Sequence, residues 1–318
     1  MSAQFAKTEW IWHNGEFIPW ASATIHVMSH VVHYGSCVFE GIRCYKTPEG
    51  PAIFRMKEHI RRLTDSAHVY RMDSAYDAEA LTEACKAIVL KNELEECYIR
   101  PLLIRGYGAA GLNPAASPVE AYVICWPWGT YLGDGALERG VDVCVSSWQR
   151  PGPNTHPVMA KAGGNYLSSQ LIKMEALANG YQEGIALGPS GLVSEGSGQN
   201  IFLVRNGKLI TPPLDGTLLE GITRDCVITI AKDMGYEVIE QPVPREMLYM
   251  ADEIFFTGTA AEVTPVRSVD KITIGKGSAG KVTLALQERL LGIAQGRLPD
   301  SFGWRTLVRK AQKEVAVA

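Results

Sequence analysis

A stretch near the middle of the chain, Pro127-Trp-Gly-Thr-Tyr-Leu-Gly-Asp-Gly135, differs in composition from the segments on either side of it. A glycine-rich break of this kind is typical of a linker between domains. We therefore predict a linker over residues 128–137, a smaller domain over residues 1–127 and a larger domain over residues 138–318. With 318 residues, of which 46% are hydrophobic, the chain is long enough to form two cores.

Both predicted domains mix strands with helices. Segments with helical periodicity predict helices over residues 55–72, 78–91, 166–179, 222–234 and 280–295. Apolar runs bounded by turn residues predict strands over residues 97–105, 119–126, 141–148, 201–204, 238–243 and 253–262, the last of which runs into a turn. Asn14-Gly15 and Asn206-Gly207 predict hairpin turns. This mixture indicates two α/β domains with largely antiparallel sheets.

The composition argues against several partners. A net charge of -3 gives no reason to expect nucleic acid or an anionic membrane. No apolar run is long enough to span a bilayer, and the first residues lack the apolar segment of a signal peptide. The seven cysteines, at positions 37, 44, 85, 97, 125, 144 and 226, contain no C-x-x-C pair. We expect them to be reduced, mostly buried thiols of a cytoplasmic protein.

Three histidines offer one alternative chemistry. A helix would place His26, His30 and His33 on one face, where they would resemble a metal site. No acidic residue follows them before Glu40, so the pattern lacks a carboxylate ligand close in sequence. A metal hydrolase is kept as an alternative, although no metal is expected.

A glycine motif offers another alternative. Gly106-Tyr-Gly-Ala-Ala-Gly111 has the G-x-G-x-x-G pattern of a dinucleotide-binding turn and follows a predicted strand. The helix that should come next is broken by Pro114 and Pro118, and another strand is predicted after them. Only half of the dinucleotide-binding pattern is therefore present, and a nicotinamide oxidoreductase is kept as an alternative on that half alone.

Lys161 lies among small, uncharged neighbours in Met159-Ala-Lys-Ala-Gly-Gly-Asn-Tyr166. It has no local carboxylate, and desolvation without a partner disfavours the ammonium form. The lysine would then be a nucleophilic amine that can condense with a carbonyl. The alternative is a surface lysine in a glycine-rich turn.

The segment from Ser194 to Arg224 decides between these interpretations. It carries E-x-S-x-x-N-I-F over Glu195–Phe202, L-x-T over Leu209–Thr211 and L-x-G-I-x-R over Leu219–Arg224. These spacings resemble the signature of the class IV pyridoxal-phosphate aminotransferases. Lys161–Tyr166 resembles the cofactor-lysine segment of their branched-chain amino acid aminotransferases, and the likeness extends from about Trp10 to about Trp304.

The resemblance implies pyridoxal 5'-phosphate as cofactor and gives each part of it a partner. Lys161 would form the Schiff base and then move the substrate proton. Glu195 would keep the pyridine nitrogen protonated, and Tyr166 would bind the ring hydroxyl. Leu219 would pack against the ring. The phosphate would be bound by Gly221, Ile222 and Thr223 at the start of a helix, by Thr259, and by Arg62, on which the family's H-x-x-R-L motif falls.

The resemblance also implies a substrate pocket for amino acids and 2-oxo acids. The turn containing Thr259, Ala260 and Ala261 would bind the α-carboxylate. The remaining pocket residues would be Tyr34, Phe39, Gly41, Tyr98, Arg100, Leu112, Trp128 and Tyr131. In the family, residues 23–43 form strand and turn at the pocket edge. The Tyr34 and Leu112 segments close the pocket of a neighbouring subunit, so at least a homodimer is implied.

The function implied is amino transfer from leucine, isoleucine or valine to 2-oxoglutarate. Related activities are those of D-amino acid aminotransferases, (R)-amine transaminases and aminodeoxychorismate lyases. Tyr98-Ile99-Arg100 favours the branched-chain activity. There are two departures from the bacterial pattern, since Ala110 stands where it usually has Met and Glu220 where it often has Pro. Neither touches the cofactor residues, and the first leaves the side-chain preference and the range of acceptors open.

Overall fold

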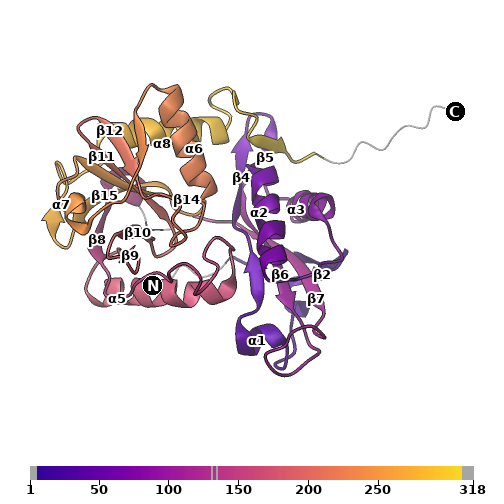
Figure 1. Ribbon diagram of the computed structural model, residues 1–318. Helices are drawn as coiled ribbons and strands as arrows, with labels where there is room; N and C mark the ends of the chain where they lie inside the picture. The colour runs from indigo at the N-terminus through magenta and orange to yellow at the C-terminus, as the bar shows by residue number, and fades with distance from the viewer. Residues whose placement is uncertain (1–5, 130–131, 134, 310–318) are drawn as a thin grey trace.

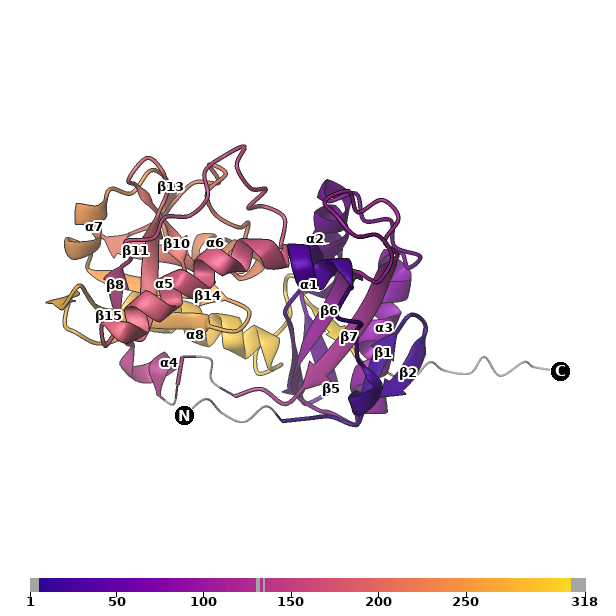
Figure 2. The same cartoon turned by 90° about the horizontal axis from the view of Figure 1, so that it is seen from below.

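Figure 1 shows a computed structural model of the chain, which describes residues 6–129, 132–133 and 135–309. Two sheets lie side by side, each with its own helices (Figures 1 and 2). The predicted α/β class with mixed sheets is therefore confirmed. The predicted domain boundaries stay a prediction.

The first sheet has the strand order β17-β5-β4-β6-β7-β1-β2, with β3 paired to β6. All of its pairs are antiparallel. Its strands are β1 (Trp10–His13), β2 (Glu16–Pro19), β3 (Cys37–Phe39), β4 (Ile42–Thr47), β5 (Gly50–Phe54), β6 (Cys97–Arg105), β7 (Val119–Trp126) and β17 (Arg305–Leu307). The last strand brings the end of the described chain back to the sheet built by its beginning.

Two helices, α2 (Met56–Val69) and α3 (Ala78–Lys91), share a core with this sheet. α3 has the predicted bounds, and the Asp77 side chain caps it by accepting a hydrogen bond from the N–H of Ala80. α2 is shorter than predicted. It begins after Arg55, whose φ of 52° is left-handed, and ends before Tyr70.

The second sheet has the order β10-β9-β8-β15-β14-β11-β12-β13, with β16 paired to β15. Its strands are β8 (Val141–Val145), β9 (Glu183–Leu187), β10 (Val193–Gly196), β11 (Asn200–Arg205), β12 (Lys208–Thr211), β13 (Val238–Glu240), β14 (Glu253–Gly258), β15 (Glu262–Val269) and β16 (Ile272–Thr273). Three of the pairs are parallel, namely β8·β9, β8·β15 and β12·β13. The pairing is thus largely antiparallel, as predicted.

This sheet is buried on both faces. Ile201 and Leu203 of β11 point into one core, whereas Phe202 and Val204 point into another that contains α6 (Ile222–Asp233) and α8 (Lys281–Ala294). A strand covered on both sides needs apolar residues at successive positions. The other helices are α4 (Ala136–Arg139), α5 (Tyr166–Ala178) and α7 (Arg245–Tyr249).

Both predicted hairpin turns are confirmed. Asn14 and Asn206 have φ values of 45° and 51°, and the glycines after them have φ values of 93° and 74°. Positive φ at both central residues is the type I′ geometry, which suits the twist of the flanking strands. These two-residue turns join β1 to β2 and β11 to β12.

The structure of residues 23–43, which the resemblance implied to be strand and turn, differs from that expectation in one respect. Residues His30–Tyr34 form a single-turn helix, α1, closed by Gly35 at a φ of 63°. The strand implied by the family begins only at Cys37 as β3. The left-handed conformation at Gly35 costs a glycine little, so the chain can end the helix and turn into β3 within two residues.

Candidate active site

One pocket lies between the two sheets and takes residues from both. It brings together most of the residues predicted for the site. They are Phe39, Gly41, Arg62, Tyr98, Arg100, Trp128, Lys161, Tyr166, Glu195, Leu219, Gly221, Ile222, Thr223, Thr259, Ala260 and Ala261. Tyr34 and Leu112 lie outside it and are 45% and 84% exposed. Tyr131 falls outside the described residues.

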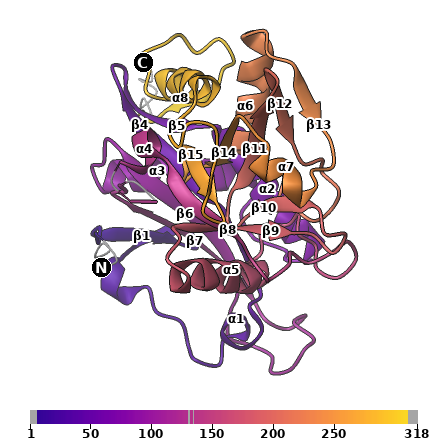
Figure 3. The same ribbon diagram turned by 90° about the vertical axis from the view of Figure 1, so that its left-hand side faces the viewer.

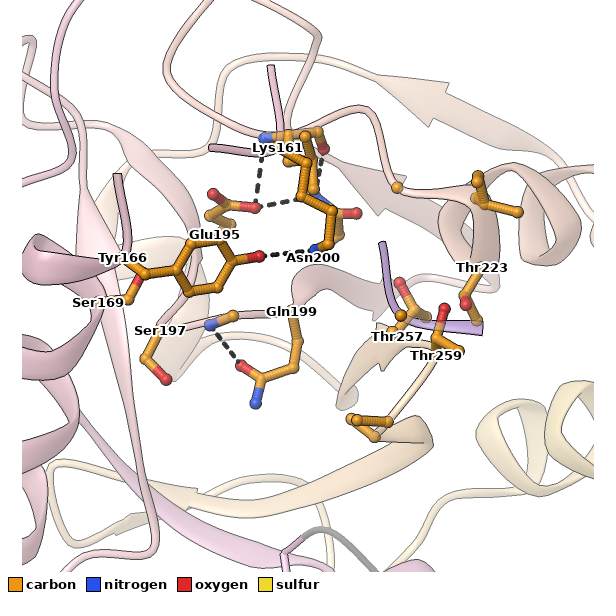
Figure 4. Close-up of a pocket in the computed structure, with 18 of the residues that line it drawn as sticks. Lys161, Tyr166, Ser169, Glu195, Ser197, Gln199, Asn200, Thr223, Thr257 and Thr259 are labelled. Atoms are coloured by element: carbon orange, nitrogen blue, oxygen red, sulfur yellow. Dashed lines mark hydrogen bonds between the residues drawn. The ribbon is translucent and has the colours of Figure 1, made fainter. Parts of the chain in front are cut away.

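Lys161 is held by its main chain, so that its side chain can reach into the pocket. Its N–H donates to Ser66 Oγ at 2.9 Å, and its carbonyl accepts from Phe39 N at 3.0 Å. The amine Nζ lies 2.6 Å from the hydroxyl of Tyr166 (Figure 4). Among the described residues, no carboxylate forms an ion pair with it. The isolated lysine expected from the sequence therefore faces a phenol in a shared pocket.

Glu195 lies on β10 and is 4% exposed. One carboxylate oxygen is 2.8 Å from Nη2 of Arg150, and the other accepts from Asn200 Nδ2 at 3.2 Å and from Leu219 N at 3.4 Å. Burial raises the pKa of the Glu195 carboxyl, and the charge of Arg150 counteracts this. The result is a buried carboxylate, fixed in orientation, at the base of the pocket.

The N-terminus of α6 forms the other end of the pocket. Gly221 is its N-cap, and no side chain caps the helix. A Cβ atom on Gly221 would lie 1.8 Å from Oδ1 of Asn200, so only glycine allows this close approach. Thr223 and Thr259 line the same end (Figure 4). Uncapped N–H groups and the helix dipole make such a terminus a suitable site for a phosphate.

Arg62 also reaches this end and is oriented by a buried carboxylate. Its Nε and Nη2 donate to the two oxygens of Glu40 at 2.6 and 2.9 Å, and its Nη1 donates to the carbonyl of Glu220 at 2.6 Å. His59 Nδ1 lies 2.7 Å from the same carboxylate. Burial would raise the pKa of Glu40, but Arg62 and His59 outweigh it and hold that pKa well below its ordinary range. Two N–H groups of Arg62 remain for a phosphate.

The substrate side of the pocket is aromatic. The Tyr98 ring stacks on Trp128 with centroids 4.9 Å apart. Gly41 makes room for this tyrosine, because a Cβ atom there would lie 1.8 Å from its hydroxyl. The guanidinium carbon of Arg100 lies 4.7 Å from the centroid of Phe39 and 5.5 Å from that of Tyr98.

Arg100 differs from Arg62 and Arg150, the other arginines of the pocket. Its Nε is buried without a hydrogen-bond partner, and within the described residues no carboxylate pairs with it. Buried charges are normally paired. Its position therefore provides a cation for a carboxylate that enters the pocket from outside the chain.

The turn after β14 is fixed from the first sheet. Arg43 donates from Nε to the carbonyl of Thr259 and from Nη2 to that of Ala260, both at 3.2 Å. Its Nη1 lies 3.4 Å from the carboxylate of Glu262. The carbonyls of the turn are thus occupied on the side of Arg43, while Thr259, Ala260 and Ala261 line the pocket.

Residues 37–269 match the family model described as amino-transferase class IV. The chain belongs to the class IV aminotransferases. The branched-chain-amino-acid aminotransferase of Escherichia coli strain K12 is 52% identical to it over 299 residues, which cover 94% of this chain and 97% of that protein. The Pseudomonas aeruginosa protein of the same name is 43% identical over the same shares.

Solved structures of the class IV family agree with the fold. The crystal structure of the Escherichia coli branched-chain amino acid aminotransferase has a TM-score of 0.94 and 51% identity, and covers 95% of this chain and 100% of that one. The crystal structure of the branched-chain amino acid aminotransferase from Thermobaculum terrenum in its holo-form, with pyridoxal phosphate, has a TM-score of 0.88 and 34% identity, with coverage of 96% and 100%.

Several pocket residues were not predicted. Asn200 belongs to the E-x-S-x-x-N-I-F motif, so its spacing was a usable signal, but it was given no role. Arg150 and Thr257 also line the pocket, and Glu40 and Ser66 support it from behind. Glu40, Ser66 and Arg150 act through contacts that are distant in sequence, and no local pattern distinguishes these three or Thr257.

The two alternative motifs have other roles. His30 is buried and bonds Ser36 Oγ at 2.6 Å and the carbonyl of Gly111 at 3.1 Å, while His33 bonds the carbonyl of Val27. Within the described ranges, no group of three or more histidine, cysteine or acidic residues could hold a metal ion. The Gly106–Gly111 segment leads from β6 to its antiparallel neighbour β7 with no helix between them, so the dinucleotide-binding context is missing. No helix in the described part of the chain is long and apolar enough to cross a membrane.

Proposed function

We propose that this protein is a pyridoxal-phosphate-dependent aminotransferase. It transfers the amino group of leucine, isoleucine or valine to 2-oxoglutarate, giving branched-chain 2-oxo acids and L-glutamate. The observation that carries the proposal is the amine of Lys161, 2.6 Å from the Tyr166 hydroxyl, in one pocket with the buried carboxylate of Glu195. The names of the relatives support the substrate class.

The residues present fit pyridoxal phosphate. Glu195 matches a protonated pyridine nitrogen, and the uncapped N-terminus of α6 matches a phosphate. Gly221 lets this helix start approach the side chain of Asn200, which also binds Glu195. Leu219 lies between Glu195 and the start of α6. Its N–H donates to Glu195, and its carbonyl accepts a hydrogen bond from Asn200. The cofactor, when bound, supplies an aldehyde that takes up the amino nitrogen and a ring that accepts electrons.

The side chains then have distinct tasks. Lys161 Nζ provides the amine and moves the proton at the substrate Cα, with Tyr166 Oη fixing its position. Glu195, held by Arg150 and Asn200, keeps a proton on the ring nitrogen. The Thr259–Ala261 turn binds the α-carboxylate, and the aromatic wall around Tyr98 excludes water from an aliphatic side chain.

Arg100 explains how the same pocket accepts glutamate. An apolar pocket would not accept the second carboxylate of glutamate or 2-oxoglutarate, because burying an unpaired charge is costly. Arg100 lies in the aromatic wall without a carboxylate partner among the described residues. A second carboxylate can therefore pair with it, while leucine leaves it stacked on Phe39.

Spectroscopy tests this function directly. The purified protein should be yellow, and its visible band should shift on addition of leucine. Borohydride should reduce the Schiff base and thereby attach the cofactor covalently to Lys161. A panel of L-, D- and aromatic amino donors would then separate the branched-chain activity from those of related class IV enzymes. A colourless protein whose activity required zinc or NAD would contradict the proposal.

We further propose that the enzyme is at least a homodimer. Tyr34, Leu112 and Tyr107 are 45%, 84% and 61% exposed, and His30 ties α1 to the loop that carries Leu112. α5 adds an exposed apolar stripe that includes Leu167 and Met174, and Figure 3 shows α1 and α5 on the same side of the molecule. Large exposed apolar surfaces are typical of interfaces.

Light scattering of wild type and Leu112→Asp tests this proposal. We expect a dimer or larger for wild type and a weakened assembly for the variant. A wild-type monomer with full activity would contradict it. We also propose a cytoplasmic location, which is supported by the seven free cysteines.

A further inference from the structure

Thr257 is a buried hydroxyl that the proposed function leaves without a role. It lies on β14, lines the pocket and is 1% exposed. Its Oγ1 has no hydrogen-bond partner among the described residues. Buried polar atoms are almost always satisfied, and leaving one unpaired destabilises the fold. A hydroxyl of this kind beside a pocket indicates a partner that comes from the pocket.

Other buried threonines of the same sheet have such partners within the chain. Thr211 Oγ1 donates to the carbonyl of Ile201 at 2.8 Å, and Thr264 Oγ1 donates to that of Ala261 at 2.6 Å. Both are also almost completely buried. The missing bond is therefore specific to Thr257 and is not a general property of threonine in this sheet.

The position of Thr257 shows which end of the pocket it faces. It follows Phe255 by two residues on β14, and side chains two apart on a strand point to the same face, so Thr257 faces the side of the sheet that carries α6. Across the β11·β14 pair its register partner is Asn200, whose Oδ1 closely approaches Gly221 at the start of α6. Figure 4 shows Thr257 next to Thr259 and near Thr223, away from Tyr166.

We propose that Thr257 is a further anion-binding residue, whose hydroxyl donates to the phosphate of the cofactor together with Thr223 and Thr259. The inference rests on the proposed function, because it assigns the anion to pyridoxal phosphate. A phosphate dianion has several acceptor oxygens and can use three hydroxyl donors as well as helix N–H groups. The cost of the unpaired hydroxyl is removed when the anion binds.

Two opposite effects of one substitution test the proposal. Thr257→Val is nearly isosteric and removes only the hydroxyl. We expect it to weaken binding of pyridoxal phosphate to the cofactor-free full-length chain by about tenfold or more, as loss of a hydrogen bond to a charged group does. The thermal midpoint of the cofactor-free protein should stay equal or rise, because an unsatisfied buried group has been removed.

Three comparisons make the test specific. Thr257→Ser keeps the hydroxyl and should bind the cofactor within about twofold of wild type, well below the effect of losing a charge-assisted bond. Thr211→Val should show the reverse pattern, with lower stability and unchanged cofactor affinity. Pyridoxal, which lacks the phosphate, should bind wild type and Thr257→Val equally well.

The outcomes separate this inference from the proposed function. If Thr257→Val binds pyridoxal phosphate as tightly as wild type does, Thr257 does not bind the phosphate. The same conclusion follows if the substitution weakens the binding of pyridoxal as much as that of pyridoxal phosphate. If its cofactor-free form is clearly less stable than wild type, the hydroxyl has a structural partner and the inference is wrong. Failure of the wild-type chain to bind pyridoxal phosphate would instead overturn the proposed function.

Discussion

The two ends of the pocket are built in different ways. At the cofactor end, charged groups are already paired: Glu195 with Arg150, and Arg62 with Glu40. At the substrate end, Arg100 has no carboxylate partner in the described part of the chain. The first arrangement holds one molecule in one orientation, whereas the second must accept side chains of two chemical classes in turn.

This difference has an energetic consequence. A preorganised site does not have to reorient its dipoles when charge develops, and this contributes much of an enzyme's rate enhancement. A cation stacked on an aromatic ring, such as Arg100 on Phe39, is stabilised when the pocket holds an apolar side chain and remains available for a carboxylate. Substitutions at the cofactor end should therefore affect all substrates equally, and substitutions at the substrate end should discriminate between them.

Removing the reactive amine should have the largest effect. In Lys161→Ala the fold is kept, because the lysine is held through its main chain by Ser66 and Phe39. The loss of both the amine and the proton-transferring group should lower turnover of leucine and glutamate alike by at least about a thousandfold. Covalent labelling of the wild-type enzyme by borohydride at another lysine, located by peptide mass spectrometry, would show that Lys161 was wrongly assigned.

Glu40 provides the second test, on stability. In Glu40→Gln, Arg62 becomes a buried cation without its carboxylate, and the free energy of unfolding at pH 7 should fall by about 3–5 kcal/mol. Because the folded-state pKa of Glu40 lies below its ordinary value, its stabilising effect is present above pH 4.5 or so and is lost as the pH falls below that value.

Urea unfolding of both proteins between about pH 7 and about pH 3 measures this effect. The difference in stability between wild type and Glu40→Gln should stay constant down to about pH 5 and narrow below about pH 4.5, at a slope of at most about 1.4 kcal/mol per pH unit. Lys46→Gln, which removes an exposed ion pair with Glu95, is the control and should leave the stability almost unchanged, because solvent screens such a pair. A gap that stays constant below about pH 4.5 would mean that the folded-state pKa of Glu40 is not lowered as inferred.

The third test addresses Glu195. A neutral Glu195→Gln side chain no longer holds the ring proton, so kcat should fall by about tenfold or more for every donor, as weakening of a charge-assisted hydrogen bond implies. The substitution also leaves Arg150 unpaired. The double variant Glu195→Gln/Arg150→Met should therefore regain stability without regaining turnover. A kcat for Glu195→Gln within a few-fold of wild type would refute the role assigned to this carboxylate.

The same contrast between the two ends governs what could be predicted from the sequence. Lys161, Tyr166, Glu195 and the Gly221–Thr223 helix start lie in continuous motifs, and the resemblance of these motifs to the class IV pattern implied that they share one pocket. Arg62 was expected to bind the phosphate and lines the pocket, but its pairing with Glu40 was not foreseen. That contact joins the β3–β4 turn to α2 and depends on how the first sheet packs.

Elements were predicted well where the pattern was long. The bounds of α3, β6 and β7 agree with the prediction. The strands predicted over 141–148 and 238–243 end early, at Val145 and Glu240. The residues that follow are partly apolar, so they resemble strand in the sequence, but they lie in loops outside the sheet. Residues 30–34 form a helix where strand and turn were implied, since five residues carry too little periodicity to separate the two.

Arg100 gives the smallest and most selective effect. Arg100→Ala removes a cation that has no ion pair among the described residues, so stability should fall by no more than about 0.5–2 kcal/mol, the value of a cation–π contact. Glutamate and 2-oxoglutarate should lose at least about tenfold in kcat/KM, the low end of the cost of breaking a buried charge pair. Leucine, which has no second carboxylate, should change much less.

Single-turnover kinetics of the cofactor-loaded enzyme with each donor separates these cases. Arg61→Ala is the matched control, because Arg61 lies next to Arg62 on α2 with an 82% exposed side chain and should leave both donors unaffected. Equal losses for leucine and glutamate in Arg100→Ala would mean that the arginine shapes the whole pocket. If Arg100 is an unpaired cation in an aromatic wall, kcat/KM should fall only for glutamate and 2-oxoglutarate, because only these substrates have a second carboxylate that can pair with it.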